Sequence, residues 1–177
     1  MILKKYQIFD KTITLRYPKP SDAQDLMNVI NSLVKEKTDI AKTAPITIQQ
    51  EKSWLKQTMQ AIKNKEKIMI VAELDGIVVG SCEITRDTYD VSRHVGTLGI
   101  GIIKPARGNG IGANLMKTTL DQAKKMGLRI IKLYVFDSNK KGKSLYEEFG
   151  FYEIGRIPSG VHHNKKYKDD IIMVKTL

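Results

Sequence analysis

A run of alternating glycines, Ala106-Arg107-Gly108-Asn109-Gly110-Ile111-Gly112, constrains this chain more than any other segment. It follows a strand-like stretch, Arg93–Ile103, and it precedes apolar residues at helical spacing from Ile111 to Ala123. The first N–H groups of a helix have no partner inside that helix. Glycines leave such groups accessible because they carry no Cβ atom, and a neighbouring arginine suits phosphate oxygens. The segment therefore predicts a strand–turn–helix unit that binds a phosphate-bearing ligand.

Composition is that of a globular protein, with 41% hydrophobic and 28% charged residues in 177. This length predicts a single domain, 1–177. The net charge of +11 indicates an anionic partner, but the lysines are scattered, which disfavours direct nucleic-acid binding. The only cysteine, Cys82, cannot form an internal disulfide, and no secretory signal or membrane-spanning apolar segment is recognisable. We expect a cytoplasmic protein with no membrane partner.

Hydrophobic periodicity predicts strands and helices in the order β-α-α-β-β-β-α-β-α-β-β. Asp75-Gly76 marks a tight turn between two strands, and Gly127 marks a helix end. This order predicts a mixed sheet with helices on its faces. The expected strands are 12–18, 67–74, 77–85, 93–103, 129–136, 152–157 and 168–175, and the expected helices open at Ser21-Asp22 and span 48–63, 110–126 and 139–150.

Two common phosphate-binding motifs do not match. A Walker A loop requires glycine five residues before Gly142-Lys143-Ser144, and that position is Asp137. A dinucleotide-binding fingerprint requires G-x-G-x-x-G and an acidic residue about 20 positions later. Gly108, Gly110 and Gly112 instead have the spacing G-x-G-x-G, and no acidic residue follows at that distance.

Arg107–Gly112 does match [RQ]-x-x-G-x-[GA], the pyrophosphate loop of the GCN5-related N-acetyltransferases. Asn139–Phe151 resembles a second motif of that family, N-x-x-A-x-x-L-Y-x-x-x-G-F, with Gly142 in place of the usual alanine. The resemblance covers 12–175. It implies the family fold, a mixed and mostly antiparallel sheet of about seven strands with about four helices on its faces. It also implies direct transfer of an acetyl group from acetyl-CoA to a primary amine, with acetyl-CoA as co-substrate.

The resemblance also implies specific roles. The family's fourth and fifth strands splay apart, and the exposed backbone of the fourth binds the pantetheine arm. An N–H near Ile100 would hold the oxyanion, and Tyr146 would protonate the leaving thiolate. Tyr146 could instead be a packing residue, and Asn139 a helix N-cap. The expected coenzyme A contacts are Leu98, Ile100, Gly101, Ile102, Arg107, Gly108, Asn109, Gly110, Ile111, Gly112, Ala113, Asn139 and Tyr146.

The general base is less defined, because the fourth strand has no carboxylate where the family often places one. Glu83, on the neighbouring strand, is the best-placed candidate to act through water, and an exposed strand glutamate is the alternative. His162 and His163 lack metal-ligand spacing, so no metal is predicted.

The acceptor is expected between two polar and basic segments, Lys35–Thr47 and Pro158–Tyr167. A small amine or amino acid predicts a closed pocket there, and a peptide or protein N-terminus predicts an open groove. A homodimer is compatible with the sequence. The alternatives are a non-catalytic coenzyme A sensor or a nucleic-acid-associated basic module.

Overall fold

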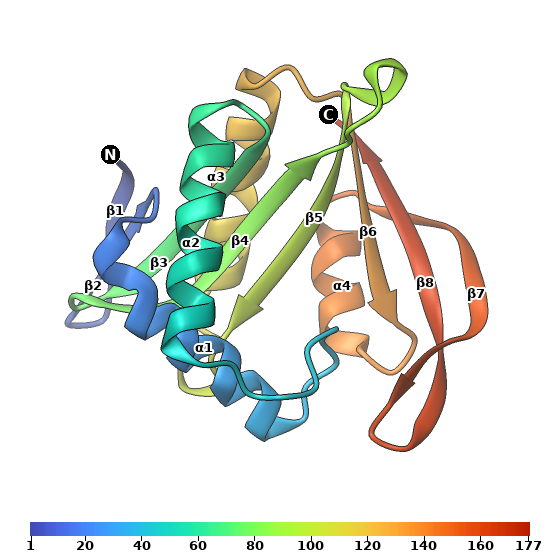
Figure 1. The fold of residues 1–177 in the computed structure, drawn as a ribbon, viewed down its shortest axis with the longest axis horizontal. Coiled ribbons are helices and arrows are strands. Elements are labelled where there is room, and N and C mark those ends of the chain that lie inside the picture. Colours follow the sequence, from blue (N-terminus) through green and yellow to red (C-terminus); the bar gives the residue numbers. More distant parts are fainter.

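The computed structural model describes all 177 residues, which build one eight-stranded sheet and four α-helices (Figure 1). The strands lie in the order β1-β2-β3-β4-β5-β6-β8-β7, and every neighbouring pair is antiparallel except β5 with β6. The predicted fold class is confirmed. The elements are β1 (Ile2–Ile8), β2 (Lys11–Arg16), α1 (Ala23–Glu36), α2 (Ile48–Lys63), β3 (Lys67–Leu74), β4 (Ile77–Arg86), β5 (Val95–Ile102), α3 (Ile111–Lys125), β6 (Ile130–Phe136), α4 (Lys140–Glu148), β7 (Tyr152–His163) and β8 (Lys166–Thr176).

Helices cover both faces of the sheet. In Figure 1, α1 and α2 lie in front of the strands, and α3 and α4 lie behind them. The larger core, 23 buried residues, fills the space between the sheet and the α3–α4 layer, and a smaller core of six lies under α1 and α2. The front face is therefore only partly covered, which leaves the region around β5 and β6 open.

Local signals explain several elements. Asp75 and Gly76 both have positive φ, 47° and 90°, which is the geometry that a two-residue hairpin turn needs. Thr47 and Gln50 form a capping box at the start of α2. Gly127, with φ 84°, follows the end of α3. The predicted turn at Asp75-Gly76 and the predicted helix end at Gly127 are confirmed, and the capping box is an additional finding of the structure.

The prediction missed strand β1. Its sequence, ILKKYQI, has no regular alternation, and a register shift between Ile2 and Lys4 interrupts its pairing with β2. The turn to β2 contains Phe9-Asp10, and Phe9 adopts a positive φ of 55° that non-glycine residues rarely take. The first predicted strand is therefore the second strand of a hairpin.

The predicted loop Pro158–Tyr167 was wrong. Strand β7 continues to His163 and β8 begins at Lys166, because a register shift between Ile157 and Val161 absorbs the Pro-Ser-Gly sequence as an irregularity inside the strand. The actual turn is Asn164-Lys165, with φ of 52° and 61°. The segment is a long hairpin arm.

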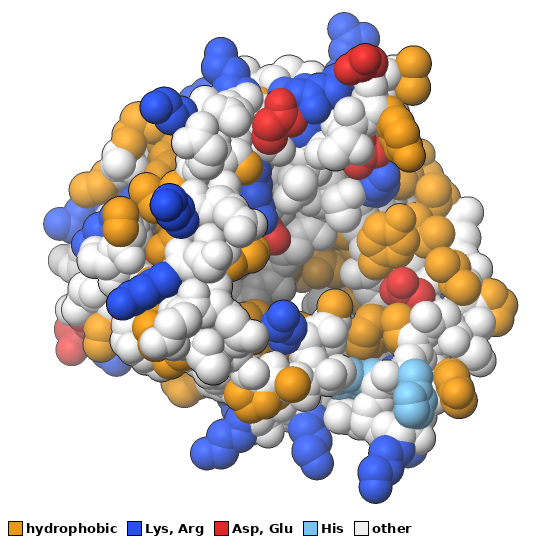
Figure 2. Space-filling view, viewed as in Figure 1, with side chains coloured by type: hydrophobic (Ala, Val, Ile, Leu, Met, Phe, Trp, Pro, Cys, Tyr) orange, Lys and Arg blue, Asp and Glu red, His pale blue; other side chains and the backbone are white.

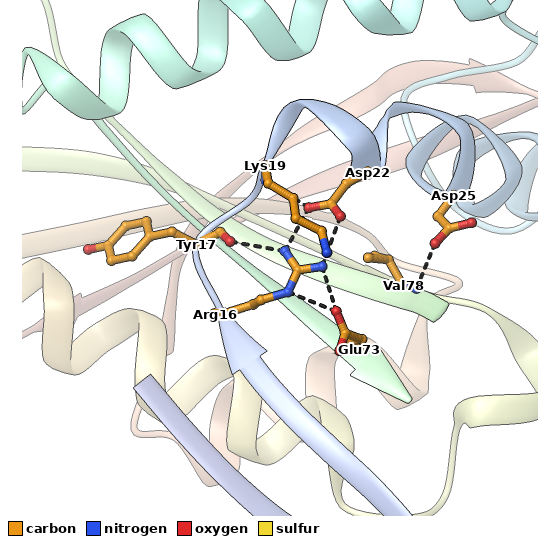
Figure 3. Close-up of polar contacts among 7 residues, drawn as sticks. All are labelled: Arg16, Tyr17, Lys19, Asp22, Asp25, Glu73 and Val78. Carbon is orange, nitrogen blue, oxygen red and sulfur yellow. Dashed lines mark hydrogen bonds and ion pairs between the residues drawn. The ribbon is translucent and has the colours of Figure 1, made fainter. Parts of the chain in front are cut away.

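A buried ion-pair network fixes the start of α1 to the sheet. Figure 3 shows the Arg16 guanidinium between two carboxylates. Its Nη atoms donate to both oxygens of Asp22 at 2.7 and 2.8 Å, and Nε and Nη2 donate to Glu73 at 2.9 and 2.7 Å. The hydrogen bonds that Arg16 donates to Asp22 and Glu73, together with the charges of both carboxylates, outweigh burial and raise the pKa of Arg16. The network holds β2, β3 and the turn before α1 in one arrangement.

Candidate active site

Strands β5 and β6 diverge and leave part of β5 without a neighbour. They pair only through Val95–Thr97 and Ile130–Lys132, whereas β5 pairs with β4 along its whole length (Figure 1). The Val95 carbonyl accepts from Asp87 N–H, and Ile103 N–H donates to the Val79 carbonyl. The backbone N–H and C=O groups of the odd-numbered residues of β5 are therefore directed toward β4. The backbone groups of the alternate residues Leu98, Ile100 and Ile102 consequently face the gap, where the Ile102 carbonyl already accepts from Arg107 Nε. An open strand edge of this kind can pair with the amides of a pantetheine arm.

The glycine loop directly follows this edge. Gly108 and Gly110 have positive φ, 80° and 70°, and Gly110 is the N-cap of α3. No backbone or side-chain acceptor in the protein receives a hydrogen bond from the N–H groups of residues 108–113. The helix macrodipole adds partial positive charge at the same end. These six N–H groups therefore fit a diphosphate, as the sequence predicts.

Two further glycines have packing explanations. A Cβ on Gly112 would lie 3.3 Å from Ile102 Cδ1, so this glycine lets α3 approach the end of β5. A Cβ on Gly101 would lie 3.0 Å from Leu33 Cδ1. The backbone groups of Gly101 are directed toward β4, and the pairing of β4 with β5 is continuous there, without a β-bulge. Its most direct structural role is to make room for α1.

Arg107 is held by a residue distant in sequence. Its Nη1 and Nη2 each lie 2.7 Å from an oxygen of Glu36, the last residue of α1, and its Nε donates to the Ile102 carbonyl at 2.8 Å. The hydrogen bonds from Arg107 lower the pKa of Glu36. The guanidinium therefore lies beside the glycine loop, paired with a carboxylate where a phosphate could compete.

Tyr146 reaches the open edge from α4. Its side chain is 7% exposed and its ring contacts Phe151 edge-on. Burial, with a smaller effect of the Cys82 thiol, raises the pKa of Tyr146 to about 12. Cys82, whose thiol is close enough to affect Tyr146, is the register partner of Ile100 in the sheet. The Tyr146 phenol therefore lies near Ile100 along β5. No protein group forms a hydrogen bond with its hydroxyl, which leaves the O–H able to donate to a ligand.

Asn139 is the N-cap of α4, and its side chain accepts from Gly142 N–H at 3.0 Å. A Cβ on Gly142 would lie 2.7 to 2.9 Å from atoms of that same side chain. Glycine at position 142 is thus matched to this cap conformation, which explains the departure from the family's alanine.

Glu83 faces the front layer beside the divergence. It pairs with Gly99 of β5 in register, and its carboxylate lies 2.8 Å from the Lys67 ammonium. A second carboxylate, Glu51 of α2, comes close enough for the charge of Glu83 to contribute to a raised pKa, although burial is the larger cause. The prediction missed Glu51. Its position in the core-facing stripe Ile48-Glu51-Leu55 was the available signal.

The front face is hollowed between α2 and the β6–β8 side (Figure 2). Part of this region, about 350 Å³ in volume, is polar and is lined by Thr85, Thr97, Lys132 and the connection after β4. Thr85 lies two residues from Glu83 on the same face of β4. The hollow therefore adjoins both the carboxylate and the open edge of β5.

The two predicted acceptor segments are joined to each other. Asp39 accepts from Lys168 at 2.5 Å and from Ser138 at 2.6 Å, and Asn164 donates to the Lys37 carbonyl at 3.3 Å. Burial alone would raise the pKa of Asp39, but the bonds from Lys168 and Ser138 outweigh it and lower the pKa. His163 is buried against Phe136 and lies 3.5 Å from Asp39. The loop after α1 consequently closes against the β7–β8 hairpin.

Two separate features bear on partners and cofactors. No three His, Cys, Asp or Glu side chains gather into a group that could hold a metal ion. None of the helices combines the length and apolar character needed to cross a membrane.

Comparison with known proteins identifies the same family. The profile of the Acetyltransferase (GNAT) family matches residues 30–151. The putative phosphinothricin acetyltransferase YwnH of Bacillus subtilis is 24% identical over 93% of this chain and 99% of its own. A phosphinothricin acetyltransferase from Sinorhizobium meliloti, solved with acetyl-CoA, superposes with a TM-score of 0.83 at 18% identity over 93% of this chain and 88% of its own. A ribosomal-protein-alanine N-acetyltransferase from Brucella melitensis superposes with a TM-score of 0.84 at 22% identity over 92% and 99%.

Proposed function

Because this chain belongs to the acetyltransferase (GNAT) family, whose members take an acetyl group from acetyl-CoA, we propose that it acetylates the primary amine of a small, amino-acid-like molecule. The observation that carries the acceptor size is the contact of Asp39 with Lys168 and Ser138. This contact joins the loop after α1 to the β8 side and would hinder passage of an extended peptide there. Small-amine acceptors also agree with the names of two relatives, which are described as phosphinothricin acetyltransferases.

The cofactor contacts follow from the free backbone groups. The N–H groups of Gly108, Asn109, Gly110, Ile111, Gly112 and Ala113 would hold the diphosphate, with Arg107 beside them. Leu98, Ile100 and Ile102 would pair with the pantetheine arm, and Asn139, at the start of α4, lies at the other side of the gap. Gly101 contributes space for α1 rather than a free backbone group.

When bound, acetyl-CoA supplies the thioester. The Ile100 N–H, which points into the gap, would then donate to the oxygen that becomes negatively charged during attack. Tyr146 keeps its proton throughout the neutral range because burial raises the pKa of Tyr146, so its hydroxyl can protonate the departing thiolate. The negative charge of Glu83, whose carboxylate is held by Lys67, would attract the acceptor ammonium.

The proposal is tested by thiol release from acetyl-CoA at pH 8 with phosphinothricin, glutamate, methionine, spermidine and a peptide beginning with alanine. We expect the highest kcat/KM for one of the free amino acids. A highest value for the peptide would overturn the small-acceptor proposal, and no turnover together with tight coenzyme A binding would favour a sensor.

A substitution in the contact of Asp39 with Lys168 and Ser138 tests the acceptor side of the proposal separately. Asp39→Asn should raise the KM for the small acceptor several-fold, because it loosens the contact between the loop after α1 and Lys168 of β8. Asp121→Asn, an exposed change on α3, is the matched control. Equal KM values for Asp39→Asn and wild type would contradict a role of this loop in closing the pocket.

A further inference from the structure

Glu51 is a buried carboxylate in a place where an apolar side chain is expected. It lies in the stripe of α2 that faces the sheet, between Ile48 and the fully buried Leu55, and only 5% of its surface is exposed. None of the hydrogen bonds or ion pairs of the protein involves its carboxylate. Its oxygens are not among the fully buried polar atoms that have no partner, so they keep access to the surface. Carboxylates in such shielded surroundings cluster at functional sites.

The charges that act on Glu51 are Glu83 of β4 and Lys42 in the loop after α1, and Lys67 of β3 lies beside Glu83. Lys67 is engaged elsewhere, 2.8 Å from Glu83 and 4.9 Å from the centre of the Trp54 ring. Burial first, and the charge of Glu83 second, raise the pKa of Glu51, and Lys42 opposes them weakly. A carboxyl group with a raised pKa takes up a proton more readily near neutral pH.

Glu51 also lies on the correct side of the sheet. Met69 and Val71 of β3 pack under α2, so Lys67 on the same strand shares that face. Glu83 pairs with Gly99, whose missing side chain leaves the space above β5 open, since a Cβ there would meet only Glu83 Cγ at 3.9 Å. Figure 2 shows acidic side chains within the hollow on this face. Glu83 thus lies on the open face of β4 and β5, and Glu51 is close enough to feel its charge.

We propose that Glu51 is the general base of the transfer, accepting a proton from the acceptor ammonium while Glu83 holds that ammonium by charge. This inference rests on the proposed function. It places the carboxylate that β5 lacks on α2, which packs across the front face. One oxygen of Glu83 is already occupied by Lys67, so Glu51 is the carboxylate that is free to take the proton.

The ammonium gives one proton to the Glu51 carboxylate, which passes it to solvent. The neutral amine forms the C–N bond to the acetyl carbon, and the C–S bond breaks. Tyr146 gives its proton to the thiolate and is reprotonated through solvent by the second proton that the new amide nitrogen releases. The products are the amide, the thiol and one free proton.

The test is the pH dependence of Glu51→Gln between pH 6.5 and 9.5, measured with the amine of the panel that wild type acetylates fastest. At pH 7 we expect kcat/KM to fall about 10²-fold or more, the usual contribution of a general base. The deficit should shrink to less than tenfold at pH 9.5, because the amine is then largely neutral without help. A merely structural role of Glu51 would not produce this recovery.

Matched variants complete the test. Glu83→Gln should raise the acceptor KM and move the acid limb of the pH profile to lower pH, because loss of its charge lowers the pKa of Glu51. Glu147→Gln, an exposed change on α4, should alter neither the acceptor KM nor the pH profile. Unchanged coenzyme A affinity in Glu51→Gln verifies that the fold is intact. A deficit that is equal at every pH, or absent, overturns the inference while an active wild type upholds the proposed function. A wild type that acetylates no amine overturns both.

Discussion

Replacing Tyr146 by phenylalanine should separate catalysis from stability. The hydroxyl has no protein partner, so its removal should change the free energy of unfolding at pH 7 by less than about 1 kcal/mol. Loss of the general acid should lower kcat by about 10²- to 10⁴-fold. Coenzyme A affinity should stay within a few-fold of wild type, because the diphosphate contacts lie on α3 and not on Tyr146.

The buried phenol also has a signature at alkaline pH. The pKa of Tyr146 is about 12 in the folded protein against about 10 when unfolded. Its contribution to stability is therefore complete below pH 10 and is lost as the pH rises to 12, in total about 2–3 kcal/mol. Tyr146→Phe should lose less stability over that interval. Burial also raises the pKa of the Cys82 thiol to about 12, and because both proteins contain Cys82, the comparison between them reports mainly on Tyr146.

Thiol release gives kcat, coenzyme A titration gives the affinity, and urea unfolding at pH 7, 10 and 11 gives the stability of each protein. Tyr152→Phe, a change at an exposed tyrosine, is the control. A variant with more than a third of wild-type kcat would refute the role of Tyr146 as general acid. A descending limb in the wild-type pH–rate profile well below pH 10, absent from the variant, would refute the raised pKa of Tyr146.

Three further changes test other contacts. Arg107→Ala should weaken coenzyme A binding about tenfold and reduce the salt dependence of that binding. Glu36→Gln releases the Arg107 guanidinium and should not weaken coenzyme A binding. Calorimetric titration at two salt concentrations compares the two variants. Gly142→Ala should change stability by less than about 1 kcal/mol in thermal unfolding, because better helix propensity offsets the disturbed Asn139 cap; a much larger loss would contradict this account. Asp22→Ala should cost about 3–5 kcal/mol in urea unfolding, since it leaves Arg16 buried with only Glu73; a cost near zero would show that the network adds little.

The sequence was most informative where short-range chemistry determines structure. The Asp75-Gly76 turn, the capping box at Thr47 and Gln50, and the glycines before α3 each depend on backbone preferences of adjacent residues, so strand–turn–helix order and the family resemblance could be predicted without coordinates. Prediction failed where a longer-range contact outweighed a local signal. Pro158-Ser159-Gly160 indicates a turn, yet pairing with β8 keeps the strand in the sheet.

The tertiary structure alone decided what the site contains besides its motifs. Arg107 meets Glu36 from 71 residues away, and Asp39 meets Lys168 from 129 residues away, so neither pair has a signal in local sequence. The same holds for Glu51, which on an isolated helix is one charged residue among many. Its burial arises only when α2 packs on β3 and β4 beside Glu83, because desolvation and the neighbouring charge depend on the assembled fold.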